Sequence, residues 1–169
     1  RREPLEATAA EIRSLGRSAQ CVSLDVADSA RVAAVFAGEV GGVDILVNNA
    51  GTAGPGTLLD LDEATWDRVM DVNTKGAWLV AQAVVRGMIE RKSGGAIINV
   101  ASVLGLAVQK WTANYPASKA ALVHLTRAMA VEWARYGIRA NALLPGYFAT
   151  EMSSGYLESE AGQAMLKRM

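Results

Sequence analysis

The stretch VDILVNNAG, residues 43–51, decides the fold of this chain. Apart from Asp44, its first five residues are apolar, which is the pattern of a parallel strand buried on both faces. The residues that follow, Asn48 to Gly51, are polar or small, so the strand ends in a polar turn. This stretch therefore predicts one buried strand of a parallel sheet with polar groups at its carboxyl end.

Three more strands and four helices are predicted around this stretch. Short apolar runs at 20–26, 96–100 and 138–144 have strand character, and helices are predicted over residues 4–15, about 28–40, 63–91 and 115–136. Such an alternation implies parallel strands joined by right-handed crossovers. The predicted fold class is α/β, a doubly wound, Rossmann-like parallel sheet. The tail, 150–169, has helical propensity interrupted by two glycines.

The composition indicates one ordinary domain spanning residues 1–169. The chain is 51% hydrophobic and 20% charged, and its 17 Lys and Arg balance 17 Asp and Glu. It has no basic cluster and no apolar run of membrane-spanning length, so we expect neither nucleic acid nor a membrane as a partner. The single cysteine, Cys21, excludes an internal disulfide and fits the cytoplasm. The single histidine, His124, leaves little room for zinc, and no metal is expected.

The carboxyl ends of the predicted strands gather the residues of interest. In doubly wound sheets, ligands bind beyond these ends. The residues at or just past them are Asp25, Val26, Asn48 to Gly51, Ser102, Pro145 and Gly146. The topology alone therefore predicts that these residues form a site.

A tyrosine and a lysine four residues apart carry the candidate chemistry. Tyr115 and Lys119 share one face at the start of a predicted helix. A neighbouring ammonium lowers the pKa of a phenol, so we expect Lys119 to tune Tyr115 for proton transfer. Ser102 follows the preceding strand and can donate a hydrogen bond to a substrate carbonyl. Asn73 interrupts a helical stretch, where asparagine is a poor helix former, which favours a buried polar role.

These residues resemble the short-chain dehydrogenase/reductase family. Its Asn-Asn-Ala-Gly motif matches residues 48–51, its catalytic asparagine and serine match Asn73 and Ser102, and its Tyr-xxx-Lys motif matches Tyr115 and Lys119. The resemblance covers essentially the whole chain. It implies an oxidoreductase that exchanges a hydride between a nicotinamide cofactor and a carbonyl or secondary alcohol substrate.

The resemblance also implies a role for each matched residue. Tyr115 would be the acid/base, Ser102 would orient the carbonyl, Lys119 would also bind the nicotinamide ribose, and Asn73 would anchor a water in a proton relay. Arg1 lies where NADP-preferring members carry an arginine, so NADP is expected, with NAD as the alternative. The complete set of implied cofactor contacts is Arg1, Asp25, Val26, Asn49, Ala50, Gly51, Tyr115, Lys119, Pro145, Gly146, Phe148 and Thr150.

The family also implies partners. Residues 146–152 are similar to those of members acting on gluconate-like sugar acids and also to those of 3-oxoacyl reductases, and the two remain unseparated. Trp111, between Ser102 and Tyr115, is expected to line the substrate pocket. The long helices of the family pair across two-fold axes, which implies a homo-oligomer, either a dimer or a tetramer.

The sequence departs from the family at both ends. Aligned on the motifs, it lacks the family's first βαβ segment, with its Gly-rich phosphate loop, and the last strand. The glycines of residues 51–56 do not match that fingerprint, and a flexible turn is expected there. The Ile45 strand would then be an exposed edge. We expect a fragment of a longer enzyme; the alternative is a non-catalytic association module acting through its two long helices.

Overall fold

Three parallel strands form the sheet of this protein. The computed structural model describes residues 2–148, 155, 158–159 and 162–163. In it, β1 (Ile45–Asn48), β2 (Gly95–Val100) and β3 (Ile138–Leu143) lie in the order β1-β2-β3. Ile45 pairs with Ala96, and Gly95 pairs with Ile138, so the carboxyl ends of all three strands meet at one edge. The predicted parallel α/β sheet is confirmed for these strands.

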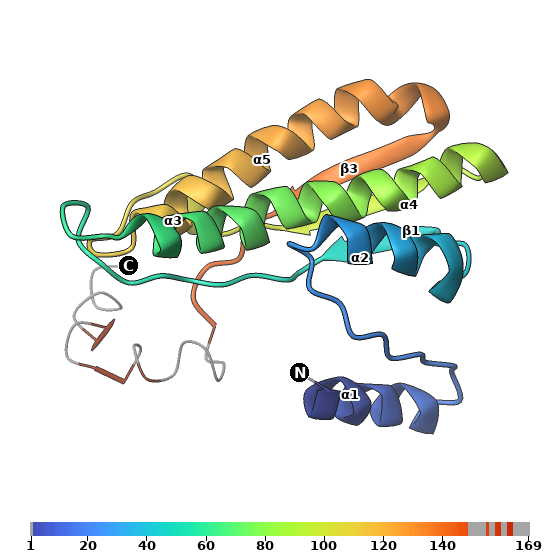
Figure 1. Cartoon of the computed structure of the whole chain (residues 1–169), viewed down its shortest axis with the longest axis horizontal. Coiled ribbons are helices and arrows are strands. Elements are labelled where there is room, and N and C mark those ends of the chain that lie inside the picture. The colour runs from blue at the N-terminus through green and yellow to red at the C-terminus, as the bar shows by residue number, and fades with distance from the viewer. Residues whose placement is uncertain (1, 149–154, 156–157, 160–161, 164–169) are drawn as a thin grey trace.

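Helices cover one face of this sheet. Figure 1 shows α4 and α5 running along that face and α2 beside α4, whereas α1 lies apart, on the other side of β1. The α-helices are α1 (Arg2–Ser14), α2 (Ser29–Ala34), α3 (Glu63–Met70), α4 (Ala77–Arg91) and α5 (Asn114–Trp133). Shorter turns are the π-helical Val35–Glu39 and Asp71–Gly76 and the 3-10 helices Val103–Gly105 and Ala134–Tyr136.

Local sequence fixes where several of these elements begin and end. Asp62 caps α3 by accepting a hydrogen bond from the Thr65 amide at 2.8 Å, and this bond lowers the pKa of the Asp62 carboxyl. Gly94 has φ +62° and lies against Gly137, the residue before β3, so closely that a Cβ on Gly94 would be 2.8 Å from the Gly137 carbonyl oxygen. Glycine is therefore required at the turn into β2.

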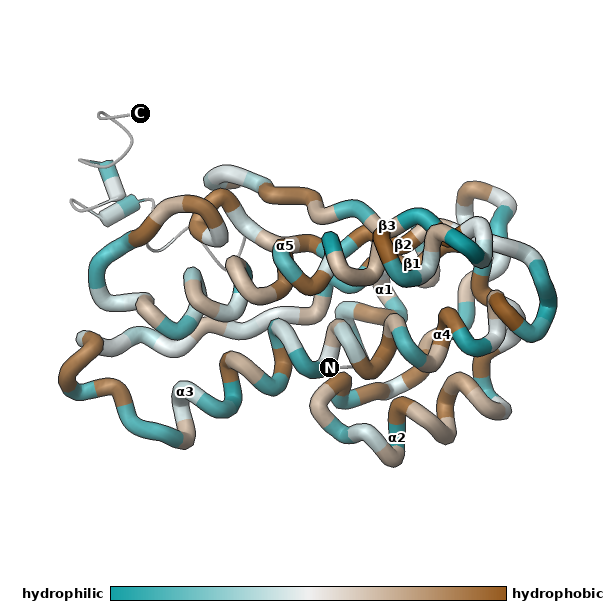
Figure 2. The backbone as a smooth tube through the Cα atoms, turned by 90° about the horizontal axis from the view of Figure 1, so that it is seen from above, coloured by the Kyte–Doolittle hydropathy of each residue, from teal (hydrophilic) through white to brown (hydrophobic). Residues whose placement is uncertain are grey.

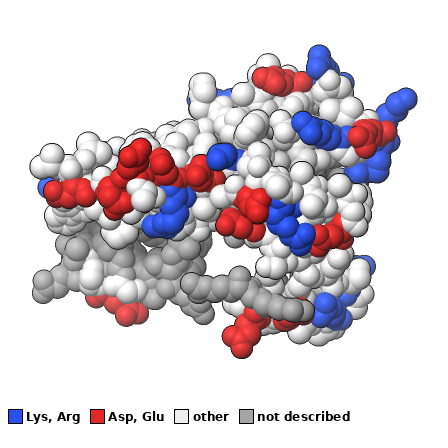
Figure 3. Space-filling model, in the orientation of Figure 1, with Lys and Arg blue, Asp and Glu red and all other residues white. Residues whose placement is uncertain are grey.

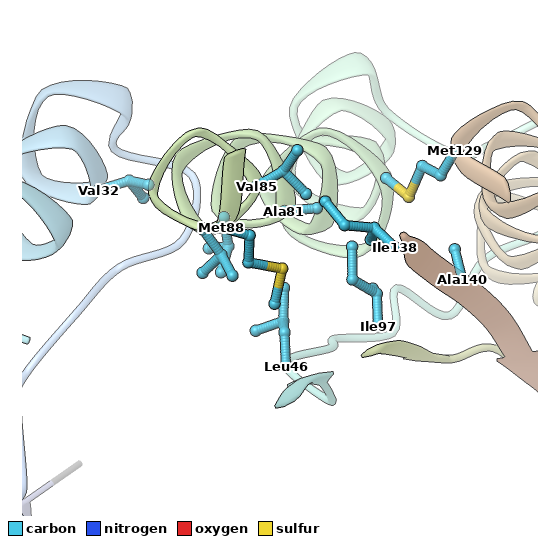
Figure 4. Close-up of a cluster of buried hydrophobic side chains, with 11 residues drawn as sticks. Val32, Leu46, Ala81, Val85, Met88, Ile97, Met129, Ile138 and Ala140 are labelled. Carbon is cyan, nitrogen blue, oxygen red and sulfur yellow. The ribbon is translucent and has the colours of Figure 1, made fainter. Parts of the chain in front are cut away.

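The main hydrophobic core lies between the sheet and α4. Figure 4 shows Leu46, Ile97 and Ile138 from the three strands directed toward Met88 and Ala81 of α4. All five side chains are at most 8% exposed. Because each strand contributes a residue to this one cluster, burial of the α4 face holds the strands in their common register.

The strand predicted at 20–26 is absent. Residues 20–25 have no regular secondary structure, Val26 lies in a turn, and among the described residues only β1, β2 and β3 form the sheet. A β-strand is stabilised by its neighbours rather than by backbone preference, so strand propensity alone does not produce one. The Ile45 edge is exposed as predicted: Ile45 and Val47 are 65% and 54% exposed.

The helical region predicted over 63–91 is present with these bounds, but it is not α-helical throughout. A π-helical turn at Asp71–Gly76 separates α3 from α4 and contains the fully buried Asn73. At its end, Gly76 lies so close to Val26 that a Cβ would be 2.6 Å from that side chain. π-Helical turns recur at functional sites, where they turn a side chain out of the regular helical spacing.

The helices are amphipathic, and the surface carries charges of both signs. Figure 2 shows hydrophobic and hydrophilic segments alternating along α3 and α4, as expected for helices with one buried face. On the face shown in Figure 3, acidic groups gather over α3, and basic and acidic groups are interspersed elsewhere. In the part of the chain that the structure describes, no helix has the length and apolar character needed to cross a bilayer.

A chain of buried amides ties the sheet to both long helices. Asn48 Nδ2 donates to the Ala77 carbonyl at 3.0 Å and to Asn99 Oδ1 at 2.9 Å. Asn99 Nδ2 in turn donates to Thr126 Oγ1 at 2.8 Å. Asn99 and Thr126 are buried, so each of these hydrogen bonds satisfies groups that water does not reach.

We expect Asn99→Ala to lower the free energy of unfolding by about 2 to 3 kcal/mol, because it leaves Asn48 and Thr126 with fewer partners in a dry site. Urea denaturation monitored by circular dichroism measures this change. The matched control is Asn141→Ala on β3, where the side chain is exposed and the expected change is below about 0.5 kcal/mol. An equal loss of unfolding free energy in the two variants would contradict a stabilising role for these buried hydrogen bonds.

Candidate active site

A cavity lies beyond the carboxyl ends of β2 and β3, where the topology predicts a site. Its volume is about 380 Å³. It brings together Ser102, Tyr115 and Lys119 with the turn after β1 and the loop after β3. The full lining is Asn49, Gly51, Thr52, Val100, Ala101, Ser102, Val103, Leu104, Tyr115, Lys119, Pro145, Gly146, Tyr147 and Phe148.

Tyr115 and Lys119 lie together on the first turns of α5. The Lys119 Nζ atom lies 5.7 Å from the centroid of the Tyr115 ring. The same Nζ donates a 2.7 Å hydrogen bond to the Val100 carbonyl at the end of β2. The expected one-face arrangement of the pair is therefore present, and the strand end fixes the direction of the ammonium group.

The ammonium of Lys119 lies in a desolvated position. The residue is only 4% exposed, and this burial lowers the pKa of the Lys119 amine below its ordinary value of 10.5. Within the described residues, Lys119 forms no salt bridge. A buried cation held mainly by a carbonyl favours a ligand that brings hydroxyl or anionic oxygens to Nζ.

Ser102 keeps a hydroxyl proton to donate. It is 8% exposed and precedes the Val103–Gly105 turn, which it caps by accepting a hydrogen bond from the Leu104 amide at 3.1 Å. Because the Oγ atom serves as the acceptor in this contact, the O–H group can donate to an oxygen placed in the cavity.

Asn73 is buried behind the cavity rather than in its wall. Its Oδ1 accepts from the Thr52 amide at 2.8 Å, and its Nδ2 donates to the Thr52 carbonyl and to Ser118 Oγ, both at 2.9 Å. The Ser118 hydroxyl donates to the Tyr115 carbonyl at 2.8 Å. Asn73 is thereby linked to the first turn of α5 and to Thr52, which does line the cavity.

The remaining predicted cofactor residues divide into four groups. Five of them line the cavity: Asn49, Gly51, Pro145, Gly146 and Phe148. A Cβ on Gly51 would lie 3.5 Å from Asn73 Oδ1 and 3.6 Å from Lys119 Nζ, so this turn passes directly over the two polar groups. Ala50 is exposed beside it.

Two predicted contacts lie away from the cavity, and two lie outside the described residues. Asp25 Oδ1 accepts from the Ala27 amide at 2.9 Å in a local turn, and Val26 packs against the π-helical turn at Gly76. Neither lines the cavity. Arg1 and Thr150 lie outside the described residues.

Trp111 and the glycine-rich segment 51–56 differ from expectation. Trp111 is 65% exposed, adopts φ +61°, and does not line the cavity. Its carbonyl accepts from the Gly56 amide at 3.0 Å, and Gly56 forms a parallel bridge with Thr112. The glycine-rich segment is thus not a free turn, because backbone bonds attach it to the loop before α5.

Sequence reasoning missed two further groups around Tyr115. Asn114 is fully buried, and its Oδ1 accepts from the Tyr115 amide at 2.8 Å. The Tyr147 hydroxyl donates to Gln109 Oε1 at 3.0 Å, which joins the loops on two sides of the cavity. The position of Asn114 directly before the tyrosine was a usable signal, whereas the contact between residues 109 and 147 has none in the sequence.

Metal-ligating side chains do not gather in this region. Within the part of the chain that the structure describes, no three His, Cys, Asp or Glu side chains lie close enough to hold an ion. The cavity is instead lined by the hydroxyl residues Thr52, Ser102, Tyr115 and Tyr147 and by Lys119 with its ammonium group.

The chain is similar in sequence to a family of known proteins. A family model described as short chain dehydrogenase matches residues 1–161. Inactive 2-(S)-hydroxypropyl-CoM dehydrogenase 2 of Xanthobacter autotrophicus is 44% identical over 160 residues, which cover 92% of this chain and 68% of that protein. Two further curated relatives are covered over only 59% of their length.

Solved structures share the fold over nearly the whole chain. A gluconate 5-dehydrogenase from Burkholderia cenocepacia in complex with NADP and tartrate is 39% identical, with a TM-score of 0.91, and the match covers 99% of this chain and 67% of that one. An NAD⁺-bound xylitol dehydrogenase is 34% identical, with a TM-score of 0.88, covering 94% and 62%. The Rossmann-like fold is therefore confirmed.

The lowered pKa of Lys119 predicts a pH-dependent stability. Below the lowered pKa the folded state holds a desolvated charge, and as pH rises from there toward 10.5 the unfolded state binds more protons than the folded state. The unfolding free energy of the wild type, minus that of Lys119→Met, should therefore rise with pH. Denaturant titrations between about pH 7 and 10.5 measure this difference. A flat or falling difference would contradict the assignment.

Proposed function

Because the chain belongs to the short-chain dehydrogenase family, we propose that it acts in an NAD(P)-dependent oxidation of a secondary alcohol or reduction of a carbonyl. The observation that carries this proposal is the convergence of Ser102, Tyr115 and Lys119 on one cavity at the carboxyl ends of β2 and β3. A binding or packing role does not require these three groups in one place.

The cavity fits the nicotinamide end of a dinucleotide. At Gly51 the backbone comes close to Asn73 and Lys119, and Pro145 and Gly146 also line the cavity. We propose that Asn49, Ala50, Gly51, Pro145, Gly146 and Phe148 contact the cofactor, together with Lys119, whose Nζ uses one N–H on Val100. When bound, the cofactor supplies or accepts the hydride.

Tyr115 is the proposed acid/base. In the oxidation direction its oxygen takes the proton of the substrate hydroxyl, and the C–H electron pair leaves as hydride; reduction reverses both transfers. The Ser102 hydroxyl donates to the substrate oxygen and holds it beside Tyr115. The Asn73 side chain is engaged by Thr52 and Ser118, so the proposed anchoring of a relay water falls to its main chain in the π-helical turn.

The proposed substrate is a small carbonyl or alcohol. Solved relatives are named for gluconate and xylitol, and a curated relative is a 3-oxoacyl reductase, so polyols, sugar acids and 3-oxoacyl groups are the classes to assay. NADP is the proposed cofactor and NAD the alternative, since relatives with either one bound are known. The single Cys21 supports the cytoplasm as the proposed location.

Tyr115→Phe separates binding from chemistry. We expect the wild type to quench and shift the fluorescence of NADPH on binding, and the variant to bind it with the same Kd within about twofold while kcat falls about 10²- to 10⁴-fold. Fluorescence titrations with NADPH and NADH, followed by assays on gluconate, xylitol and a 3-oxoacyl thioester, measure both. Failure of the wild type to bind either cofactor would reject the proposal.

The outer faces of α4 and α5 support a proposed homo-oligomer. A groove between these helices includes Trp78, Val131, Trp133 and Tyr136 in its lining, with the charged Arg86, Glu132 and Arg135 beside them, and Val131 is 81% exposed. Aromatic residues on an exposed helical face are typical of subunit contacts, and a two-fold axis would bury the same patch on both copies.

Val131→Glu tests this contact. A charge at this exposed apolar position should convert the assembly to single chains, as measured by light scattering after size exclusion. Leu59→Glu is the control, because Leu59 is 92% exposed on a loop far along the chain from both helices. A wild type that is already a single chain, or a Val131→Glu assembly of unchanged mass, would contradict it.

A further inference from the structure

Asn114 is a buried amide that the proposed chemistry leaves unassigned. It is fully buried at the first position of α5, directly before Tyr115. Its Oδ1 accepts from the Tyr115 amide at 2.8 Å, and that amide also donates to the Thr112 carbonyl at 3.1 Å. The side-chain oxygen is therefore a second, direct constraint on the backbone of Tyr115.

The other end of the Asn114 side chain reaches the glycine-rich segment. Among the described residues, Nδ2 has no hydrogen-bond partner, and it lies against Gly54, where a Cβ would be 2.7 Å away. That Cβ would also collide with Thr65 of α3. An unpaired buried donor costs stability, so the fold gains little from asparagine here through Nδ2. Asparagine at this position does, however, contact Tyr115 and Gly54 at the same time.

The same segment also reaches the other candidate catalytic groups. Two residues before Gly54, Thr52 lines the cavity and holds both ends of the Asn73 amide. Two residues after Gly54, the Gly56 amide donates a hydrogen bond to the Trp111 carbonyl. Trp111 is one of two non-glycine residues with positive φ among the described residues. Positive φ in a bulky residue needs surrounding contacts to hold it, and here a backbone bond supplies one.

We propose that Asn114 is a positioning residue that couples segment 51–56 to the placement of Tyr115. One side chain bridges the segment and the tyrosine backbone, so a displacement of either is transmitted to the other. Segment 51–56 thereby fixes the position of Asn73 through Thr52 and the position of Tyr115 through Asn114. The two residues are therefore placed together. This inference rests on the proposed function, because it assigns Asn114 to the placement of the proposed acid/base.

Asn114→Ala tests the coupling in the purified protein. The variant loses the Oδ1 contact and leaves Gly54 without its neighbour. We expect kcat to fall at least about tenfold while the cofactor Kd stays within about twofold, because misplacing a reacting group affects chemistry more than binding. Amide hydrogen exchange should become faster in residues 51–56 and 112–118.

Two further variants separate positioning from loss of stability. Asn114→Asp keeps an oxygen in place and, once its buried carboxyl is protonated, matches a neutral amide in shape; it should recover part of kcat, most at acidic pH. Met129→Ala, on the same helix and 3% exposed in the core, should lose stability yet keep kcat within about twofold when assayed fully folded.

The outcomes distinguish this inference from the proposed function. A wild type that binds no cofactor and turns over none of the three substrate classes rejects the function, and hydrogen exchange then decides the coupling alone. Unchanged exchange in residues 51–56 of Asn114→Ala overturns the inference. So does a kcat loss no larger than that of Met129→Ala in an active protein, or an Asn114→Asp variant with no recovery at any pH.

Discussion

The hydrogen bond from Lys119 Nζ to the Val100 carbonyl joins the two halves of the candidate site. It connects the first turns of α5 to the carboxyl end of β2, and every other group is arranged around that junction. Tyr115 is one helical turn before Lys119, and Ser102 is two residues after Val100, so this contact helps to set their separation. The core between α4 and the strands keeps β2 in register, which lets the helix start be fixed against the strand end.

Much of this site could be predicted from the sequence because its chemistry is local. Tyr115 and Lys119 are one turn apart on a helix, so their proximity follows from helical geometry. The cavity's place beyond β2 and β3 follows from the parallel topology, which brings strand ends together wherever the intervening helices run. Besides Tyr115 and Lys119, five predicted cofactor positions line the cavity, and they belong to the turns that follow β1 and β3.

The features that could not be predicted depend on contacts between distant segments. The run at 20–26 has strand propensity, yet a strand forms only beside another strand, and none of the described strands pairs with it. The π-helical turn at Asp71–Gly76 arises where Asn73 bonds Thr52 and Ser118, 21 and 45 residues away. Helical periodicity contains no information about such bonds, so the sequence predicts a helical region over residues 63–91 but not the π-helical turn within it.

The buried polar groups of this protein divide by what satisfies them. The amides of Asn48, Asn73 and Asn99 donate to partners within the fold, so they make a rigid frame whose geometry does not depend on a ligand. Lys119 differs, because its charge is desolvated and carbonyl contact offsets only part of that cost. A ligand that brings oxygen atoms to Nζ would offset the remaining desolvation cost of the Lys119 ammonium. The side-chain amides of Asn48, Asn73 and Asn99 are thus satisfied within the fold, whereas the ammonium of Lys119 is only partly satisfied.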